Sequence, residues 1–210
     1  MCKRETTMCK RAIKRIVILT FIFSGTIFIS INLFSMSLKM GLKGGVGLSH
    51  LQSDSGSTKD ITVTNGGLAV EWVVSPNIAL EVDLMHQQEG GIFSNGIQEL
   101  NYWSFPVIIK VFEPFGKGNK TVFTPFLGIG GNFQHLYKAK RFRMTDNSVK
   151  KNNYKFLLTL GFKITPPIDS NLLDFSFEWR YEQGFEDVGT DRTMKTFSHQ
   201  FLFGLMIKVF

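Results

Sequence analysis

The stretch at residues 172–183, LLDFSFEWRYEQ, decides the fold of this chain. Large apolar or aromatic side chains alternate with polar or charged ones along it, as in the run Phe177, Glu178, Trp179, Arg180. Successive side chains of a strand point to opposite faces, so strict alternation predicts a β-strand with one apolar and one ionic face. The stretch alone leaves open whether its apolar face meets a protein core or a membrane.

The same alternation recurs throughout the chain after residue 37, between clusters of Gly, Asn, Asp, Ser and Pro. The eight predicted strands are residues 38–48, 67–75, 78–87, 100–112, 122–134, 154–164, 172–183 and 198–210. The second and third are separated only by a tight turn around Pro76, which predicts an antiparallel hairpin. Pro106 lacks an amide donor and predicts an irregularity in the fourth strand.

The links between these strands alternate in length. Short links follow the second, fourth and sixth strands, whereas the odd-numbered strands are followed by longer polar segments at residues 49–66, 88–99, 137–153 and 184–197. An up-and-down antiparallel meander with turns at one end and loops at the other has this pattern, which is typical of outer-membrane barrels. The four longer segments are therefore expected to be extracellular loops.

The distribution of charged residues distinguishes a membrane barrel from a soluble one. A Lys or Arg on the lipid face near the bilayer midplane costs about 2–4 kcal/mol, so a membrane barrel needs one charge-free face in every strand. The apolar faces of the eight segments meet this requirement, and glycines collect on the opposite face. The charged residues expected inside the barrel are Glu71, Glu81, Asp83, Lys110, Lys163, Glu178 and Arg180. Buried charges require partners, so we expect acid–base pairs among them.

We therefore predict an all-β chain that forms an eight-stranded antiparallel up-and-down transmembrane β-barrel. The interior of such a barrel is only wide enough to be filled by side chains. A soluble, lipocalin-like carrier with its apolar face inward is the alternative, but Phe, Trp and Tyr from every strand would overfill that interior.

The amino-terminal residues read as an export signal. Six Lys or Arg within the first fifteen residues precede an apolar run at residues 16–34, and Ser35 and Ser37 offer small residues for cleavage. We expect a cleaved signal peptide at residues 1–37 and a barrel domain at residues 38–210, with an uncleaved anchor as the alternative because the run could span a bilayer. Both cysteines, Cys2 and Cys9, precede the run, so the mature chain could form no disulfide.

The net charge of +7 comes mainly from this signal, since the first fifteen residues hold six basic side chains against Glu5. The rest of the chain carries +2, which gives no argument for nucleic acid as a partner.

Several short motifs resemble the outer-membrane β-barrel proteins that include the PorT-like and OmpX-like groups. They are GLKGGVGLS at residues 41–49, QEGG at 88–91, LNYWSFP at 100–106, PFLGIG at 125–130, RYEQGF at 180–185 and the terminal Phe210. The resemblance covers residues 40–210 and implies an eight-stranded barrel in the outer membrane of a diderm bacterium. It also implies that Phe210 is an assembly signal for the barrel-assembly machinery.

The last strand departs from the family pattern. Members usually keep apolar residues in phase with the final Phe, but here Lys208 has that phase and Val209 and Ile207 have the other. Either a bulge near the end of the chain resets the register or Phe210 points inward.

The segment at residues 137–153 is the most basic part of the barrel domain. It contains Lys138, Lys140, Arg141, Arg143, Lys150 and Lys151 against a single acid, Asp146. As an outward loop it could contact lipopolysaccharide phosphates or an anionic host polymer by charge attraction, or it could be a solvated loop without a ligand.

Catalytic and metal-binding patterns are weak. Ser198, His199 and Asp191 could be taken for a hydrolase set, but adjacent residues of a strand face opposite ways, so Ser198 and His199 cannot simply pair. Asp83 and His86 meet the same objection, and the sequence contains no metal-ligand cluster or phosphate-binding glycine loop. We expect no catalytic residue, cofactor or metal. The side chains expected at the membrane interfaces are Trp72, Trp103, Trp179 and Tyr181.

The sequence thus predicts a non-enzymatic outer-membrane protein with a structural or surface-interaction role through its loops. Its expected partners are outer-membrane lipid and lipopolysaccharide, the barrel-assembly machinery during insertion, and a host or other extracellular ligand. Small-solute transport is the alternative function, and an outer-membrane hydrolase is a further one.

Overall fold

The computed structural model describes residues 37–53, 56–93, 96–115, 121–141, 144–145, 150–167, 172–185 and 194–209. The expected signal segment at residues 1–37 lies outside these ranges, except for Ser37, where the first strand begins. The strands are β1 (Ser37–Ser53), β2 (Gly56–Ser57), β3 (Ile61–Ser75), β4 (Ile78–Phe93), β5 (Gly96–Phe112), β6 (Val122–Arg141), β7 (Met144–Thr145), β8 (Asn152–Thr165), β9 (Leu173–Gly184) and β10 (Met194–Lys208). No helix within the described ranges is long and apolar enough to cross a membrane.

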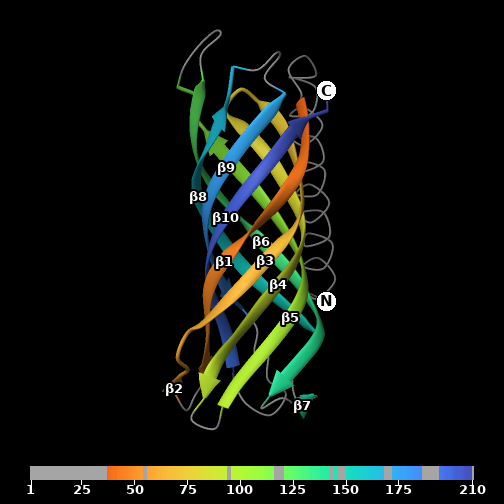
Figure 1. Cartoon of the computed structure of the whole chain (residues 1–210), viewed down its shortest axis with the longest axis vertical. Coiled ribbons are helices and arrows are strands. Elements are labelled where there is room, and N and C mark those ends of the chain that lie inside the picture. Colours follow the sequence, from red (N-terminus) through yellow and green to blue (C-terminus); the bar gives the residue numbers. More distant parts are fainter. Residues whose placement is uncertain are drawn as a thin grey trace, which may run out of the picture. The chain divides into compact units, whose positions relative to one another are not determined.

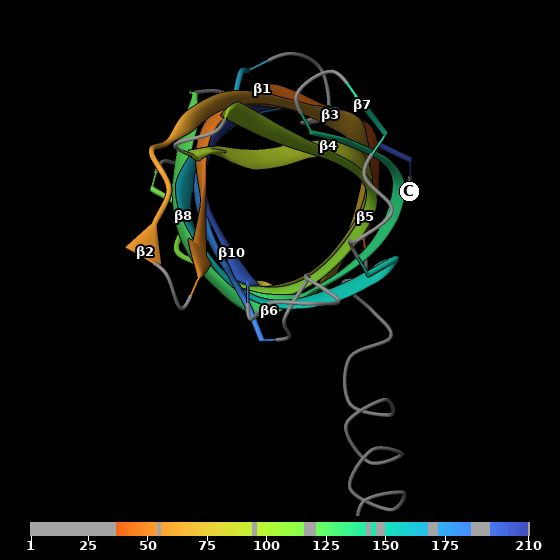
Figure 2. The same cartoon turned by 90° about the horizontal axis from the view of Figure 1, so that it is seen from below.

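The eight long strands form one closed antiparallel barrel, which confirms the predicted fold class. Each long strand pairs with the next along the chain, and β10 pairs with β1 to close the ring (Figures 1 and 2). The closure runs from Lys39 opposite Lys208 to Ser53 opposite Met194. Beyond it, the Val209 amide donates a hydrogen bond of 2.8 Å to the Leu38 carbonyl.

The strands are strongly staggered. Leu48 of β1 pairs with His199 of β10, and following the paired residues around the barrel returns to β1 at Leu38, ten residues away. A stagger of this size tilts the strands against the barrel axis, by roughly 35–45° in barrels of this kind. Figure 1 shows the tilt as strands that cross the picture diagonally.

The alternating sequence divides each strand between the interior and the outer surface. In β9 the side chains of Glu178 and Arg180 are buried, whereas Phe177 between them is 42% exposed on the outer surface. In β5 the same division separates buried Lys110 from exposed Ile109. The apolar residues of this protein therefore mostly cover its outside, and its charges fill its inside.

Three irregularities interrupt the described ladders. The pairing of β3 with β4 shifts by one residue between Val73 and Ser75, next to the β3–β4 turn. The pairing of β5 with β6 shifts by one residue between Asn101 opposite Lys138 and Tyr102 opposite Leu136, so Tyr137 forms a bulge in β6. The pairing of β4 with β5 has a gap between the pair formed by Val82 and Val107 and the pair formed by Met85 and Ser104. This gap lies at Pro106, where the sequence predicted an irregularity, because proline has no amide to donate.

The glycines Gly130 and Gly131 of β6 meet different surroundings. A Cβ at Gly130 would lie 2.1 Å from the Val107 carbonyl oxygen of β5, closer than any real contact. A Cβ at Gly131 would have the Lys155 carbonyl oxygen at 3.7 Å as its nearest neighbour, an ordinary contact. Close approach of the β5 backbone therefore requires glycine at position 130 but not at 131.

The expectation of four long loops is wrong for much of their length. β4 reaches Phe93 and β5 begins at Gly96, so most of the segment at residues 88–99 is a hairpin of two strands. β1, β6 and β10 also extend into segments expected to be loops. The alternation of apolar and polar residues fades there although the backbone stays extended.

We call the end of the barrel with β2, β7 and the β4–β5 hairpin the loop end, and the end with the β3–β4 turn the turn end. Leu38 and Val209 lie at the turn end, the upper end in Figure 1. β10 pairs with both neighbours without a shift up to Ile207 and Lys208, so no bulge resets its register there. Phe210 lies outside the described residues.

Candidate functional site

The centre of the barrel interior contains a cluster of six charged side chains, which we call the central cluster. Its members are Lys43, Glu81, Asp83, Lys110, Glu178 and Arg180. Lys43 Nζ lies 2.5 Å from Glu81 and 3.0 Å from Glu178. Arg180 Nη2 lies 2.9 Å from Asp83 and 2.5 Å from Glu178. Three cations thus meet three carboxylates, which satisfies the requirement that buried charges be paired.

Two more ion pairs lie between the central cluster and the turn end. Lys163 of β8 pairs with Glu71 of β3 across the interior. Lys39 of β1 pairs with Asp174 of β9, which also accepts a hydrogen bond of 2.6 Å from the Thr165 hydroxyl. Strands that are not neighbours in the sheet are therefore linked through the interior.

A polar network continues the charged interior toward the loop end. Lys155 contacts Glu89 and lies 3.6 Å from Glu182, so one cation serves two carboxylates. The Gln87 amide bridges the same pair, at 2.9 Å from Glu89 and 2.6 Å from Glu182. Asn132 donates to Glu182 and Gln134 donates to Glu89. The two carboxylates share one cation, and the side-chain amides provide the remaining hydrogen-bond donors to them.

An apolar layer lies beyond this network, among the strand extensions of the loop end. Leu51, Leu100, Tyr102 and Ala139 are buried against one another, and Phe93 and Leu136 pack on them. These side chains come from β1, β4, β5 and β6 and lie on the interior face of the wall. An apolar layer next to a charged interior opposes the passage of water and ions, because neither finds hydrogen-bonding partners there.

The structure brings together all seven charges that the sequence placed in the interior. It adds six that the prediction did not include, namely Lys39, Lys43, Glu89, Lys155, Asp174 and Glu182. Five of these lie within predicted strands, at positions that alternate with the apolar ones. The alternation could therefore have identified them as interior residues. Glu89 fell in a segment expected to be a loop.

The outer surface is apolar through the middle of the barrel. Ile109 of β5, Ile129 of β6 and Leu160 of β8 are each more than half exposed. Ile109 and Ile129 are directly paired. Exposed apolar side chains, aliphatic or aromatic, occur on each of the eight long strands and form the continuous band that a lipid-facing wall requires.

Aromatic and histidine side chains border the band toward the loop end. Trp103, Tyr137 and His86 form one group, with ring centroids 6.0 Å apart for Trp103 and Tyr137 and 5.7 Å for His86 and Tyr137. We call these three residues the aromatic shelf. Trp179 and Tyr181 contact His199 in a second group. Trp72 lies on the turn-end side, in the part of β3 that pairs with Leu38.

The predicted basic segment is only partly described. Lys138 and Lys140 are exposed on β6, and Lys150 and Lys151 are exposed just before β8. The side chain of Arg141 and the whole of Arg143 lie outside the described residues. We call Lys138, Lys140, Lys150 and Lys151 the basic rim.

The structure does not assemble the hydrolase set considered from the sequence. Ser198 is buried on the interior face, whereas His199 lies on the outer face and stacks on Trp179 with ring centroids 5.9 Å apart. Asp83 lies in the central cluster, whereas His86 belongs to the outward aromatic shelf. Asp191 lies outside the described residues. Among the residues that are described, no group of three or more His, Cys, Asp or Glu could hold a metal ion.

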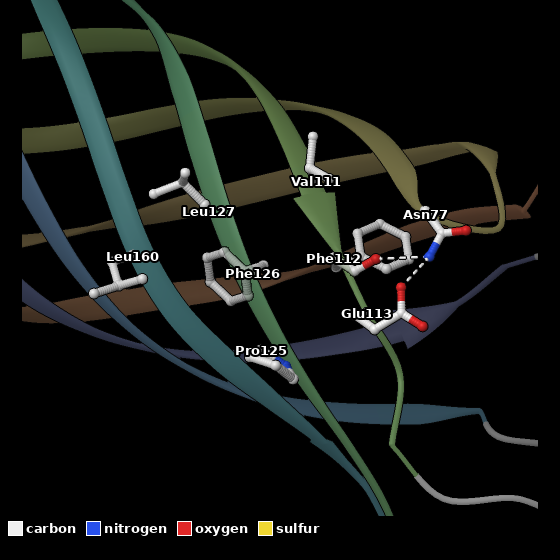
Figure 3. A pocket seen from close by; sticks show the side chains of 8 residues that line it. All are labelled: Asn77, Val111, Phe112, Glu113, Pro125, Phe126, Leu127 and Leu160. Atoms are coloured by element: carbon white, nitrogen blue, oxygen red, sulfur yellow. Dashed lines mark hydrogen bonds between the residues drawn. The ribbon is translucent and has the colours of Figure 1, made fainter.

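A shallow hollow in the wall lies near the turn end and is shown in Figure 3. Its lining residues are Asn77, Val111, Phe112, Glu113, Pro125, Phe126, Leu127 and Leu160. The Asn77 amide donates to the Phe112 carbonyl at 3.0 Å and to the Glu113 carboxylate at 2.8 Å. The rest of the lining is apolar, so the hollow offers no arrangement of groups for catalysis.

Sequence comparison gives no relative, since no family model and no curated protein matches this chain. The resemblance to the PorT-like group stays a prediction. Solved structures do match. Neisserial surface protein A is 11% identical with a TM-score of 0.50, over 80% of this chain and 96% of its own. The outer membrane protein OprG from Pseudomonas aeruginosa is 14% identical with a TM-score of 0.50, over 81% of this chain and 95% of its own. The chain has the fold of the eight-stranded β-barrels of bacterial outer membranes.

Proposed function

We infer that this chain is an integral outer-membrane protein with a closed interior, and that it acts through contacts of its outer and loop-end surfaces. The observation that carries this proposal is the filling of the barrel. Ion pairs and amides occupy the interior from Lys39 to Lys155, and the apolar layer follows them. A side-chain-filled interior suits a structural or interaction role better than a porin-like one.

The orientation follows from the same architecture. In barrels of this class the short turns face the periplasm and the longer connections face the outside. The loop end, with the β4–β5 hairpin and the basic rim, would therefore face the exterior. Insertion would use the barrel-assembly machinery, with Phe210 as its signal, after removal of residues 1–37.

Two measurements test the proposal. Membrane fractionation with a heat-modifiability gel shift should place the protein in the outer membrane as a folded barrel, and sequencing of its amino terminus would locate the cleavage site. A cytosolic or non-shifting protein would contradict the membrane assignment.

The closed interior has its own test. The purified protein in planar lipid bilayers should give no conductance above the bare membrane. Steady ion-selective channels would instead support solute transport, the alternative function. Hydrolysis of lipid or peptide substrates is not expected, because Ser198 and His199 face opposite sides of the wall.

A further inference from the structure

The bulge at Tyr137 changes which residues of β6 face outward. Before it, Asn132 and Gln134 are buried on the interior face. After it, Ala139 is buried and Lys138 and Lys140 are exposed. Without the extra residue, both lysines would keep the phase of Gln134 and point into the barrel. The bulge therefore presents two cations on the outer surface.

These lysines stand directly beside the aromatic shelf. Tyr137 precedes Lys138 in the chain, and its hydroxyl hydrogen-bonds to His86 Nε2. Lys138 is opposite Asn101, which is two residues from Trp103 of the shelf. Trp and Tyr side chains gather at the level of lipid headgroups in membrane proteins. Lys138 and Lys140 come directly after Tyr137 in the chain, and this position places them at the level of the lipid phosphates.

The other two members of the basic rim lie on the same side of the barrel. The Leu136 amide donates a hydrogen bond of 2.6 Å to the Lys151 carbonyl, which holds residues 150 and 151 against β6. Glu99 is the residue opposite Lys140 in β5, but no carboxylate within the described ranges forms an ion pair with any of the four amines. Among the residues that the structure describes, these four cations have no carboxylate partner, so they are available for an external anion.

We propose that the basic rim binds the phosphate groups of anionic lipid in the outer leaflet, with the aromatic shelf against the adjoining acyl chains. The inference rests on the membrane location proposed above and adds a partner and its residues. The amines of lysine are point charges suited to phosphate. Long lysine stems also extend along apolar surface while the amine stays at the headgroup level.

The position of the rim favours lipid over a soluble polyanion. Lys138 and Lys140 are on the outward side of the wall, next to the shelf, rather than at the tip of the projecting hairpin. Near the end of that hairpin, the described strand residues Ile92 and Ile97 are paired and exposed. A polyanion approaching from solution would meet the hairpin first, whereas a lipid phosphate reaches the lysines from the side.

Fluorescence quenching of Trp103 by labelled lipid tests the proposal. The full chain with Trp72→Phe and Trp179→Phe keeps Trp103 as its only tryptophan and would be reconstituted in phosphatidylcholine vesicles. Phosphatidic acid and phosphatidylcholine, each with a nitroxide at the same acyl position, are the probes. Phosphatidic acid should quench at lower mole fraction, and Lys138→Gln with Lys140→Gln should reduce this preference about fivefold for each lysine removed.

The matched control replaces exposed lysines elsewhere at the loop end. Lys59→Gln with Lys195→Gln removes the same charge from the segment between β2 and β3 and from β10, and it should leave the preference unchanged. Equal quenching by both lipids in the parent protein would overturn the proposal. A second result would also overturn it. The parent protein would show no lipid preference but would bind soluble dextran sulfate, and replacement of the rim lysines would abolish that binding. Both variants should keep the heat-modifiability shift, so loss of lipid preference is distinguishable from failure of the barrel assignment.

Discussion

Lys110 of β5 and Glu178 of β9 meet across the barrel interior, with the lysine Nζ 3.1 Å from the carboxylate. The same amine donates a hydrogen bond of 2.7 Å to Glu81 of β4. Lys110 is fully buried, so one cation links three strands at a site without access to bulk water. Its removal is the most direct test of how much the interior contributes to stability.

Lys110→Met should destabilise the barrel by about 3–5 kcal/mol, because it leaves Glu81 and Glu178 short of a buried cation. The free energy of unfolding would be measured by urea titration in lipid vesicles with tryptophan fluorescence. Lys195→Met is the matched control, since Lys195 is exposed and lies outside the basic rim. Equal stability of the two variants would mean that the ion pairs of the central cluster contribute little.

The pair formed by Lys163 and Glu71 should behave differently when both members are replaced. Lys163→Met alone leaves a buried carboxylate without its main partner and should be strongly destabilising. Lys163→Met with Glu71→Leu removes both charges and should recover most of the loss, because apolar replacement of a whole buried pair is often neutral or stabilising. A double-mutant cycle in the same unfolding assay measures the coupling. Additive losses would show that the two charges do not act as a pair.

Gly130→Ala should impair folding, whereas Gly131→Ala should be tolerated. The added methyl group at position 130 would collide with the Val107 carbonyl oxygen, but position 131 has ordinary contact distances. Replacing the second glycine also reduces the entropy of the unfolded chain, which is worth about 0.4–1 kcal/mol of stability where the backbone conformation suits alanine. The yield of the heat-modifiable form after refolding into vesicles would compare the two. A fully folded Gly130→Ala protein would contradict the close approach of β5 and β6.

Ile109→Lys should cost about 2–4 kcal/mol in a bilayer, because the side chain lies on the lipid-facing band. Thr62→Lys is the control, since Thr62 is exposed near the loop end of β3. Unfolding from vesicles should separate the two variants. If both are as stable as the parent protein, the apolar band does not face lipid.

The alternation of side chains was sufficient to predict the barrel and its two faces. In residues 173–183, every second position is buried and the positions between them are exposed or half-buried. This pattern is strong because lipid on one side and a charged interior on the other restrict both faces at once. The same restriction predicts from the sequence alone that Glu178 and Arg180 lie inside the barrel.

The prediction failed where one of these restrictions disappears. Beyond the aromatic shelf, neither face of a strand must avoid charge, so apolar and polar residues no longer alternate there. The sequence therefore predicts a loop at Glu89 and Glu99, although β4 and β5 continue through them. The bulge at Tyr137 was also missed, because a one-residue shift leaves no signature in a segment rich in lysine. The exposure of Lys138 and Lys140 depends on that shift and could not be derived from the sequence phase.

The hydrogen bond between Val209 and Leu38 brings the first and last described strands together at the turn end. Closure of the ring makes the position at which the sequence starts nearly arbitrary, so the barrel should tolerate circular permutation. A permuted gene could join β10 to β1 through a short glycine-rich linker and open the chain at Pro76. β4 would then be made first and β3 last, and barrel closure would shift to the β3–β4 seam.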